Sequence, residues 1–519
     1  MTPVDSTPSA ADASMAEFQR RESAALAMGG AAKLARRQAQ GVLNARERID
    51  YLCDAGSFIE SGLFGTSASN AADREKTPAD GKIAGFGRIQ SRETALVVND
   101  FTVMGASSSS TNGRKIAHMK QVATRRGLPL VFLGESSGAR MPDTMGSRGM
   151  GALLGNDGTQ YQRTRETPWA SATLGYSYGS SSWYAVLSDF CVIRKGAVLA
   201  VSSAMLTSLA IKEEVDPEAL GGWRLHAETT GFADVVADTD EQALDAIKTF
   251  LSYLPGHQNE MPPLHAVPEG SGTDMPGILG LLPQRRTQVY DVRTIVRAIV
   301  DKASFFELKA RFGKVAVTGL ARLDGRSVGI VANNPLVKGG ALDTEACEKI
   351  TSFLVLCDSF NIPVLTFVDT PGFVIGTEAE RRRAPGKIMN MMNALSLMTV
   401  PKLSVILRKS YGQAYLNMGG GKNSDEVIAW PTAEVSFMDP RFAVKIVHGL
   451  DAGEPGFDEA LVDMNRGNEI WDAASIYAVQ AVIDPANTRA HLIRMLEVHR
   501  SRLSHGIGEH RLANWPTSF

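Results

Sequence analysis

Short apolar runs alternate with helix-spaced apolar positions along this 519-residue chain. In the first half, Ala95-Leu-Val-Val-Asn99 and Pro129-Leu-Val-Phe-Leu133 are bounded by polar residues, Gly or Pro. Runs of this length and composition predict buried strands. Between them, residues 114–126 carry apolar side chains at helical spacing, which predicts a helix. This order of elements is typical of an α/β fold.

The second half repeats this pattern 234 positions further on, without a gap from residues 85–138 to residues 319–372. The apolar runs return as Gly329-Ile-Val-Ala-Asn333 and Pro363-Val-Leu-Thr-Phe367, with a predicted helix at 348–360 between them. The identical pairs are Gly85 and Gly319, Arg88 and Arg322, Asn99 and Asn333, Gly105 and Gly339, Lys115 and Lys349, Pro129 and Pro363, and Gly138 and Gly372. So many matches at one offset predict a tandem duplication.

Composition suggests where the two halves begin and end. Residues 255–283 contain six prolines and several glycines, which is typical of a linker. We therefore expect an N-terminal domain at 21–254 and a C-terminal domain at 284–519. Residues 1–20 are predicted to be a disordered leader. Residues 20–40, rich in Ala, Arg and Lys, predict a surface helix.

The charge and residue counts exclude several classes of protein. With 54 Lys and Arg against 56 Asp and Glu, there is no basic surplus to hold nucleic acid or an anionic membrane. Without a long apolar run or a signal-like N-terminus, we expect a cytoplasmic protein that spans no membrane. The four cysteines lack C-x-x-C spacing and the nine histidines lack H-x-x-x-H spacing, so no metal site is expected.

Each half contains two glycine-bearing turns directly after apolar runs. They are Ser136-Ser-Gly-Ala-Arg140 and Gly175-Tyr-Ser-Tyr-Gly-Ser-Ser181 in the first half, and Asp369-Thr-Pro-Gly-Phe373 and Tyr411-Gly-Gln-Ala414 in the second. A small-residue turn that leads into a helix leaves backbone N–H groups free. Two such turns side by side can aim two N–H groups at one oxygen. The pattern therefore predicts an oxyanion hole in each half.

These motifs resemble the carboxyltransferase subunits of biotin-dependent acyl-CoA carboxylases, such as the propionyl-CoA carboxylase β chain. The resemblance runs from about residue 44 to residue 489. It is carried by Ala45-Arg-Glu-Arg-Ile-Asp50, Ser137-Gly-Ala-Arg140, Leu220-Gly-Gly222, Tyr290-Asp-Val-Arg293, Asp369-Thr-Pro-Gly-Phe373, Ile406-Leu-Arg-Lys409 and Ala429-Trp-Pro-Thr-Ala433. It implies an α/β fold made of two crotonase-like (ClpP/crotonase-type) β-β-α spiral domains.

The resemblance also implies a division of labour. The N-terminal half would bind an acyl-CoA, and the C-terminal half would receive carboxybiotin from a biotin carrier charged by a biotin carboxylase. In this family the active site lies between two subunits, which implies a homo-oligomer, from dimer to hexamer. No side-chain base is required, because the biotin enolate can take the α-proton.

Site residues follow from the same resemblance. The backbone N–H groups of Ser180 and Ser181, after Gly179, would hold one oxyanion, and those of Gln413 and Ala414, after Gly412, would hold the other. The loops expected to contact the bound CoA thioester and biotin contain Gly105, Ala106, Ser137, Gly138, Ala139, Arg140, Gly372 and Phe373.

The sequence also departs from the family pattern, which usually has Gly-Gly-Ala in both second turns. Here they read Gly179-Ser-Ser181 and Gly412-Gln-Ala414. A Gln413 side chain that fills the space next to the Ala414 N–H would exclude biotin. Two alternatives therefore stay open: a biotin-independent decarboxylase or hydrolase acting on an acyl-CoA thioester, and a catalytically inactive scaffold subunit. Residues 141–169 fit the family poorly and are expected to form an altered lid.

Two side chains are candidates for chemistry outside the family mechanism. Ser177 lies in a G-x-S-x-G match, Gly175-Tyr-Ser-Tyr-Gly179, which is the context of a hydrolase nucleophile, but no His or Asp partner can be named. Small-residue packing is the favoured interpretation. Glu135 is a candidate general base for a biotin-independent enzyme. The favoured interpretation there is a solvated or Arg-paired carboxylate.

Overall fold

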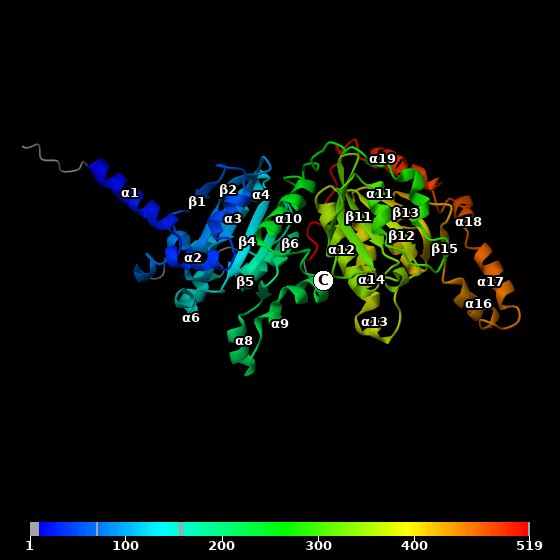
Figure 1. Ribbon diagram of the computed structural model, residues 1–519, viewed down its shortest axis with the longest axis horizontal. Coiled ribbons are helices and arrows are strands. Elements are labelled where there is room, and N and C mark those ends of the chain that lie inside the picture. The colour runs from blue at the N-terminus through cyan, green and yellow to red at the C-terminus, as the bar shows by residue number, and fades with distance from the viewer. Residues whose placement is uncertain (1–9, 69–70, 155–157, 159, 517–519) are drawn as a thin grey trace, which may run out of the picture. The chain divides into compact units, whose positions relative to one another are not determined.

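The computed structural model describes residues 10–68, 71–154, 158 and 160–516 (Figure 1). The chain forms two compact units. The first consists of Met1–Arg163, Thr167–His226 and Val235–Lys248, and the second consists of Thr164–Glu166, Ala227–Asp234 and Thr249–Phe519.

Among the described residues, the first unit has an eight-stranded sheet in the order β1-β2-β3-β4-β5-β6-β8, with β7 paired to β5. Its first two pairings are antiparallel and the others are parallel. The strands are β1 (Ile59–Ser61), β2 (Lys82–Ile89), β3 (Arg92–Asn99), β4 (Leu130–Ser136), β5 (Trp169–Tyr178), β6 (Phe190–Arg194), β7 (Val198–Ala200) and β8 (Val235–Ala237). The helices are α1 (Ala10–Leu26), α2 (Ala31–Ala39), α3 (Ala45–Leu52), α4 (Ser110–Arg126), α5 (Met141–Thr144), α6 (Gly146–Leu153), α7 (Ser180–Leu187), α8 (Ala204–Ile211), α9 (Pro217–Gly221) and α10 (Asp240–Tyr253), with shorter turns η1 (Ala71–Asp73), η2 (Pro78–Gly81), η3 (Met104–Ala106) and η4 (Leu225–Thr229).

The second unit has the same sheet, in the order β16-β14-β13-β12-β11-β10-β9 with β15 paired to β13, again counted over the described residues. The strands are β9 (Phe306–Leu308), β10 (Ala316–Leu323), β11 (Arg326–Asn333), β12 (Val364–Thr370), β13 (Lys402–Tyr411), β14 (Glu426–Ala429), β15 (Glu434–Ser436) and β16 (Ala481–Val482). The helices are α11 (Arg293–Ile299), α12 (Thr344–Ser359), α13 (Thr377–Arg381), α14 (Ala384–Leu397), α15 (Gln413–Asn417), α16 (Pro440–His448), α17 (Phe457–Arg466), α18 (Ile470–Ser475) and α19 (Thr488–His499), with η5 (Met275–Leu281), η6 (Lys338–Gly340) and η7 (Pro485–Asn487).

The predicted duplication is confirmed strand by strand. Each strand from β1 to β8 has its counterpart in β9 to β16, and the registers agree: Gly85 pairs with Leu96, and Gly319 pairs with Ile330. Gly85 and Gly319 are both glycine for the same physical reason. A Cβ on Gly85 would lie 2.2 Å from the carbonyl oxygen of Ile59, and one on Gly319 would lie 2.6 Å from that of Phe306. In both units the outer strand therefore crosses too closely for a side chain.

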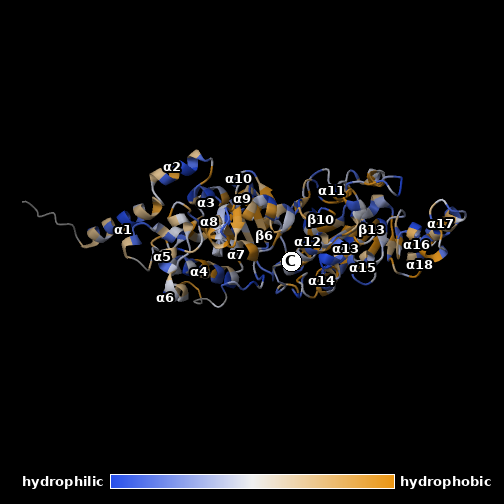
Figure 2. Cartoon of the chain, turned by 90° about the horizontal axis from the view of Figure 1, so that it is seen from below, coloured by the Kyte–Doolittle hydropathy of each residue, from blue (hydrophilic) through white to orange (hydrophobic). Residues whose placement is uncertain are grey.

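The strands are largely hydrophobic (Figure 2), and each unit buries its own core between sheet and helices. Among the buried lysines is one matched pair, Lys115 in the first half and Lys349 in the second. The Lys115 ammonium donates to the carbonyls of Gly62, Ala79 and Lys82, and the Lys349 ammonium donates to those of Lys309, Phe312 and Ala316. An ammonium has three donors, so both are fully satisfied. These identical residues therefore tie each helix to the start of a strand.

Two segments differ from their compositional interpretation, and a third is described only in part. Residues 10–20, predicted as part of a disordered leader, belong to helix α1, while residues 1–9 of that leader lie outside the described residues. Residues 255–283 lie within the second unit and bury Met275, Ile278 and Leu282 in its core, because a proline-rich segment can still carry apolar anchors. Of the predicted lid at 141–169, residues 155–157 and 159 lie outside the description, and α5 and α6 form part of the rest.

The predicted helix at 20–40 is two helices. α1 and α2 are separated at Gly29 and Gly30. A Cβ on Gly29 would lie 2.2 Å from the carbonyl oxygen of Thr102, and Gly30 has a φ of 91°. The chain therefore needs glycine at this break. In the part of the chain that is described, no helix is long and apolar enough to cross a membrane.

Candidate active site

The two glycine turns of the first half lie side by side. They follow the adjacent parallel strands β4 and β5, so both leave the same edge of the sheet. Gly138 has a φ of 102° and Gly179 a φ of 60°, and a Cβ on Gly179 would lie 3.9 Å from the Gly138 Cα. Both positions thus favour glycine for their backbone conformation.

Helix α7 begins directly after Gly179 and presents two free backbone donors. The N–H groups of Ser182 and Trp183 donate to the Gly179 carbonyl at 2.9 and 3.1 Å. The N–H groups of Ser180 and Ser181 donate to no acceptor among the described residues. Their hydroxyls are drawn into the protein: Ser180 Oγ bonds Ser108 Oγ, and Ser181 Oγ accepts from Asn99 at 3.5 Å.

The loops predicted to bind CoA come together beside this turn. The N–H of Ser137 donates to the Gly105 carbonyl at 2.8 Å, and Ser136 Oγ donates to the Ala106 carbonyl at 3.1 Å. Ser108 and Ala139 form an isolated parallel bridge. Gly105, Ala106 and the loop 137–140 therefore form one connected surface.

Arg140 takes a different position from its neighbours in that loop. Its side chain is buried, forms an ion pair with Asp80 and donates to Ser107. Asp80 also accepts from the N–H of Asn112 at 3.0 Å. The Arg140 guanidinium thus holds the loop from inside and is not available at its surface.

Glu135 is held as an ionised carboxylate. It is 6% exposed and accepts from Arg37 at 2.7 and 2.8 Å and from Arg48 at 2.9 Å. Burial favours the neutral acid, but the charges and hydrogen bonds of Arg48 and Arg37 outweigh it and lower the pKa of Glu135. This group is the Arg-paired carboxylate and is not poised to accept a proton near neutral pH.

Ser177 does not have the setting of a nucleophile. It is fully buried, and its Oγ has no hydrogen-bond partner within the described structure. A Cβ on Gly134 would lie 3.4 Å from this oxygen and 3.0 Å from Ser181 Oγ, so Ser177 fills a tightly packed space. A serine nucleophile needs a base within hydrogen-bond reach, and none is present among these contacts.

The second half repeats the paired turns. Gly372 has a φ of 129° and Gly412 a φ of 60°, and a Cβ on Gly372 would lie 4.0 Å from the Tyr411 carbonyl oxygen. Within the described residues, the N–H groups of Gln413 and Ala414 again donate to no protein acceptor. Phe373 bridges to Leu342 as Ala139 does to Ser108. The geometry of the first half is therefore reproduced.

Gln413 leaves its turn open. Its side chain is exposed, and its amide donates to Asn417 Oδ1 at 3.1 Å, one helical turn further on. Ala414 is fully buried. The Gln413 side chain extends along α15 toward Asn417, which argues against the alternative in which it fills the space next to the Ala414 N–H.

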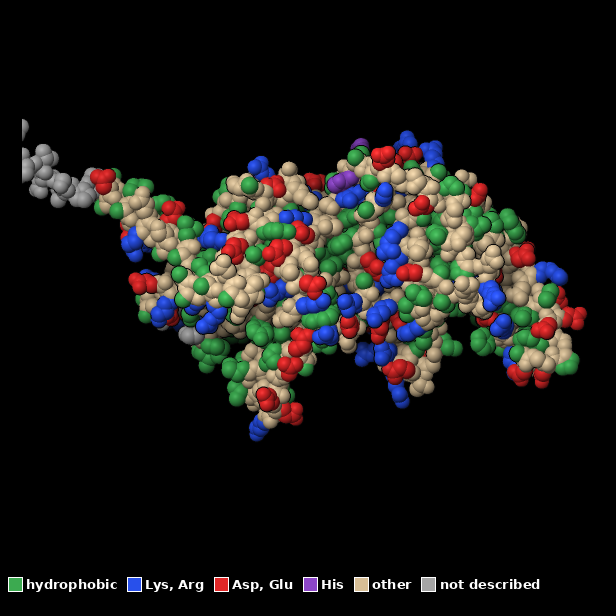
Figure 3. Space-filling model, in the orientation of Figure 1, with side chains coloured by type: hydrophobic (Ala, Val, Ile, Leu, Met, Phe, Trp, Pro, Cys, Tyr) green, Lys and Arg blue, Asp and Glu red, His purple; other side chains and the backbone are tan. Residues whose placement is uncertain are grey.

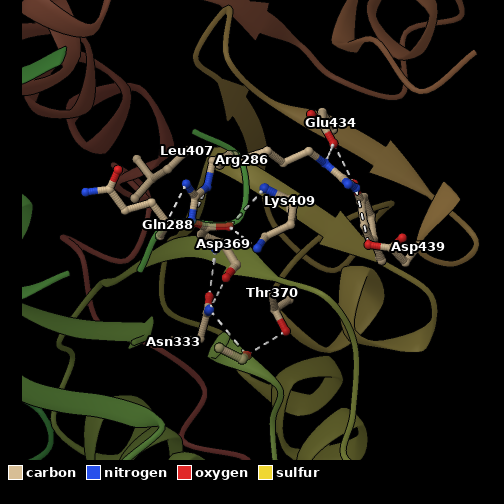
Figure 4. A network of polar contacts seen from close by, with 12 residues as sticks. Arg286, Gln288, Asn333, Asp369, Thr370, Leu407, Lys409, Glu434 and Asp439 are labelled. Atoms are coloured by element: carbon tan, nitrogen blue, oxygen red, sulfur yellow. Dashed lines mark hydrogen bonds and ion pairs between the residues drawn. The ribbon is translucent and has the colours of Figure 1, made fainter. Parts of the chain in front are cut away.

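A buried ionic network supports the second pair of turns (Figure 4). Asp369, with no exposed surface, accepts from Arg408 Nε at 2.9 Å and from the N–H of Lys409 at 3.2 Å. The N–H of Asp369 donates to Asn333 at 2.7 Å. Thr370 Oγ1 accepts from the N–H of Gly372 at 3.2 Å. The network thus ties the turn from Asp369 to Phe373, which follows β12, to Arg408 and Lys409 of the neighbouring strand β13.

A second cluster holds the end of β13. Glu434 accepts from Arg286 at 2.9 Å and from the Tyr411 hydroxyl at 2.5 Å, and Arg286 also lies 3.5 Å from Asp439 (Figure 4). Burial and Glu434 raise the pKa of Tyr411 above its usual range. The phenol therefore stays neutral and directly precedes Gly412.

Two of these buried carboxylates could have been predicted from the sequence repeat. Glu135 and Asp369 stand 234 positions apart, and both are buried carboxylates paired with arginine. The repeat offset could have marked them as a structural pair. The partners of Glu135, Arg37 and Arg48, lie outside the repeated stretch of residues 85–138, so the repeat offset did not link them to Glu135. In the described ranges, no three His, Cys, Asp or Glu residues group as a metal site.

Comparison with known proteins now identifies the family. Residues 36–511 match the model described as the carboxyl transferase domain. The chain belongs to the carboxyl transferase domain family. The predicted resemblance is therefore confirmed, and so is the fold class that it implied.

Relatives of this carboxyl transferase domain chain align over nearly their full length. The propionyl-CoA carboxylase carboxyltransferase subunit of Haloferax mediterranei is 35% identical over 500 residues, 94% of this chain and 96% of that protein. The methylmalonyl-CoA decarboxylase subunit alpha of Propionigenium modestum is 30% identical over 504 residues, again 94% and 96%. A crystal structure of transcarboxylase 12S, a hexamer with methylmalonyl-coenzyme A and methylmalonic acid bound, has a TM-score of 0.88 and 31% identity, covering 96% of this chain and 97% of that one.

Proposed function

We propose that this protein moves a carboxyl group between carboxybiotin and the α-carbon of an acyl-CoA. The observation that carries the proposal is the matched pair of turns, each with two backbone N–H groups that have no acceptor in the described chain. Two oxyanions need stabilisation in this reaction, one on each substrate. Preorganised N–H pairs are suited to both.

The first-half turn is assigned to the acyl-CoA. The N–H groups of Ser180 and Ser181 would hold the thioester oxygen as the enolate forms, with the loops at Gly105 and Gly138 beside them. Support comes from the related transcarboxylase 12S, whose crystal structure contains methylmalonyl-coenzyme A. The hydroxyls of both serines are bonded to the protein, so they leave the N–H groups free.

The second-half turn is assigned to biotin, delivered by a carrier protein. The N–H groups of Gln413 and Ala414 would hold the ureido oxygen. In the transfer, the N–C bond of carboxybiotin breaks, a C–C bond forms at the α-carbon, and the α-proton passes to the ureido nitrogen. Glu135, paired with two arginines, is not needed as a base.

We further propose that the protein acts as a homo-oligomer with a biotin carboxylase and carrier as partners. Apolar side chains are strongly exposed on α8 and α16, including Met205, Leu209, Phe442 and Ile446, and Figure 3 shows green side chains around the protruding α8. Monomeric surfaces rarely expose such patches. The hexamer described for transcarboxylase 12S supports a second copy as the occupant.

The test combines the purified protein with a carboxylated biotin carrier and acetyl-, propionyl- and butyryl-CoA. We expect labelled carboxyl to appear on at least one acyl-CoA. Failure to exchange label with every substrate would contradict the proposal. Turnover of an acyl-CoA without any biotin would instead support the biotin-independent decarboxylase or hydrolase.

A further inference from the structure

Lys82 is a buried lysine at the first-half site that the proposed mechanism does not use. It is the first residue of β2, is 1% exposed, and pairs in register with Asn99. Its Nζ donates to Asn99 Oδ1 at 3.3 Å and to the Ala106 carbonyl at 3.1 Å. The equivalent position in the second half is Ala316, so this amine belongs to the first site alone.

Its hydrogen bonds reach all the loops of that site. Ala106 O also accepts from Ser136 Oγ, which in turn accepts from the N–H of Gly138 at 3.2 Å. On the other side, Asn99 Oδ1 accepts from Lys82 Nζ, and Asn99 Nδ2 donates to Ser181 Oγ. One side chain therefore connects the turn at Ala106, the turn at Gly138 and the start of α7.

Lys82 differs from Lys115 and Lys349 in the acceptors that its ammonium bonds. Lys115 and Lys349 each use three carbonyls, whereas Lys82 has two acceptors and no carboxylate within ion-pair distance among the described residues. A cavity of about 20 Å³ lies between Lys82, Asn99, Gly134, Ser180 and Ser181. That volume admits about one water. The described residues supply two acceptors for this nitrogen, so its third N–H, or the lone pair of the neutral amine, can face a water in this cavity.

Burial and the neighbouring charges together bring the pKa of Lys82 close to neutral pH. Burial lowers the pKa of Lys82 to about 7, against a favourable contribution from Asp80 and with further lowering by Arg140 and Lys115. Asp80 is already paired with Arg140. The amine can therefore gain or lose a proton near neutral pH.

We propose that Lys82 is a positioning residue of the first oxyanion turn, acting through Asn99 on Ser181 and through a positive charge beside the developing enolate. The proposal rests on the proposed carboxyl transfer. When Lys82 is protonated, its charge stabilises the enolate oxygen held at Ser180 and Ser181. When it loses the proton, the turn keeps its shape but the charge is gone.

The test is the pH profile of kcat between pH 6 and 8.5. In the wild-type protein kcat should fall as pH rises through about 7. Lys82→Met should lower kcat on the order of tenfold at pH 6, with KM for the acyl-CoA within about twofold, and should remove the fall. Lys115→Met is the matched control: it removes a buried lysine that bonds only carbonyls, and the fall should persist, at a somewhat higher pH because Lys115 lowers the pKa of Lys82.

A second variant separates charge from packing. Asn99→Asp places a carboxylate 3.3 Å from Lys82 Nζ, which should move the fall in kcat to higher pH. A wild-type profile that is flat over this range, or a Lys82→Met profile with the same fall, would overturn the proposal even if the Asn99 variant does not fold.

Failure of the proposed function is recognised separately. A nitroethyl thioether of CoA, whose nitronate anion mimics the enolate, tests Lys82 without turnover. Its affinity should weaken about tenfold in Lys82→Met at pH 6 and not in Lys115→Met. If carboxyl transfer is absent but this difference is found, the acyl-CoA site stands and only the transfer reaction is wrong; equal affinities would reject the role of Lys82.

Discussion

Gly179 packs directly against Gly138, so that a Cβ on Gly179 would come within 3.9 Å of the Gly138 Cα. This contact brings two turns from different strands to one place. The N–H groups of Ser180 and Ser181 belong to the backbone that directly follows this contact. Substitutions that keep or remove a single N–H can therefore separate backbone from side-chain effects.

Ser180→Pro removes the first donor of the acyl-CoA turn. Ser180 is the first residue of α7, where proline is tolerated because its N–H is not needed by the helix. We expect kcat to fall about 10²- to 10³-fold, the loss typical of one oxyanion donor. Ser180→Ala also loses the bond to Ser108 but keeps the N–H, so it should stay within about tenfold of wild type. Steady-state kinetics on both variants would refute the assignment if their kcat values were equal.

Gln413→Pro makes the corresponding change in the second half. Gln413 is the first residue of α15 and follows Gly412, which accepts a proline after it without steric conflict. Carboxyl exchange with the biotin carrier should fall about 10²- to 10³-fold, while acyl-CoA binding stays unchanged. Gln413→Ala, which loses only the bond to Asn417, is the control. Weakened acyl-CoA binding in the proline variant would assign this turn to the wrong substrate.

The duplication made much of the fold predictable. Lys115 and Lys349, or Gly85 and Gly319, match in sequence because each pair meets the same contact in three dimensions. The glycine turns could be predicted for the same reason, since a positive φ leaves a mark in the residue type. The helices at 114–126 and 348–360 extend a few residues further toward the N-terminus, to caps at Ser109 and Asp343.

The parts that were missed depend on contacts between distant segments. Arg37 and Arg48 reach Glu135 across 98 and 87 positions, and Arg286 reaches Glu434 across 148. None of these pairs has a local pattern. The proline-rich segment 255–283 shows the reverse problem: its composition is typical of a linker, yet Ile278 is fully buried in the second core. Burial is decided by what a segment packs against, which composition does not record.

Glu135→Gln should destabilise the first unit far more than it changes chemistry. It removes the counter-charge of the buried Arg37, while Arg48 keeps its ion pair with Asp240, and this change costs about 3–5 kcal/mol of unfolding free energy. Because the pKa of Glu135 is lowered in the folded state, its contribution is present above the ordinary Glu pKa of about 4.3 and is lost as pH falls through the folded value. Denaturant titrations at pH 4 and pH 7 should show a smaller difference between variant and wild type at pH 4. A kcat per folded protein more than 10²-fold below wild type would contradict this prediction and indicate that Glu135 acts as a general base.

Lys349 predicts a pH dependence of the same sign, but in a higher pH range, in the second unit. Burial lowers the pKa of Lys349 to about 7, against about 10.4 in an unfolded chain. Between these values the folded state binds fewer protons than the unfolded state, so this group makes the unfolding free energy rise with pH. Its destabilising cost is fully present below pH 7 and is relieved toward pH 10. Lys349→Met has no such proton to lose, although it leaves three carbonyls without a donor. The stability advantage of wild type over this variant should therefore grow from pH 7 to pH 9.5 in urea titrations. An advantage that is constant or shrinks over that range would show that Lys349 stays charged in the folded protein, held by its three carbonyls.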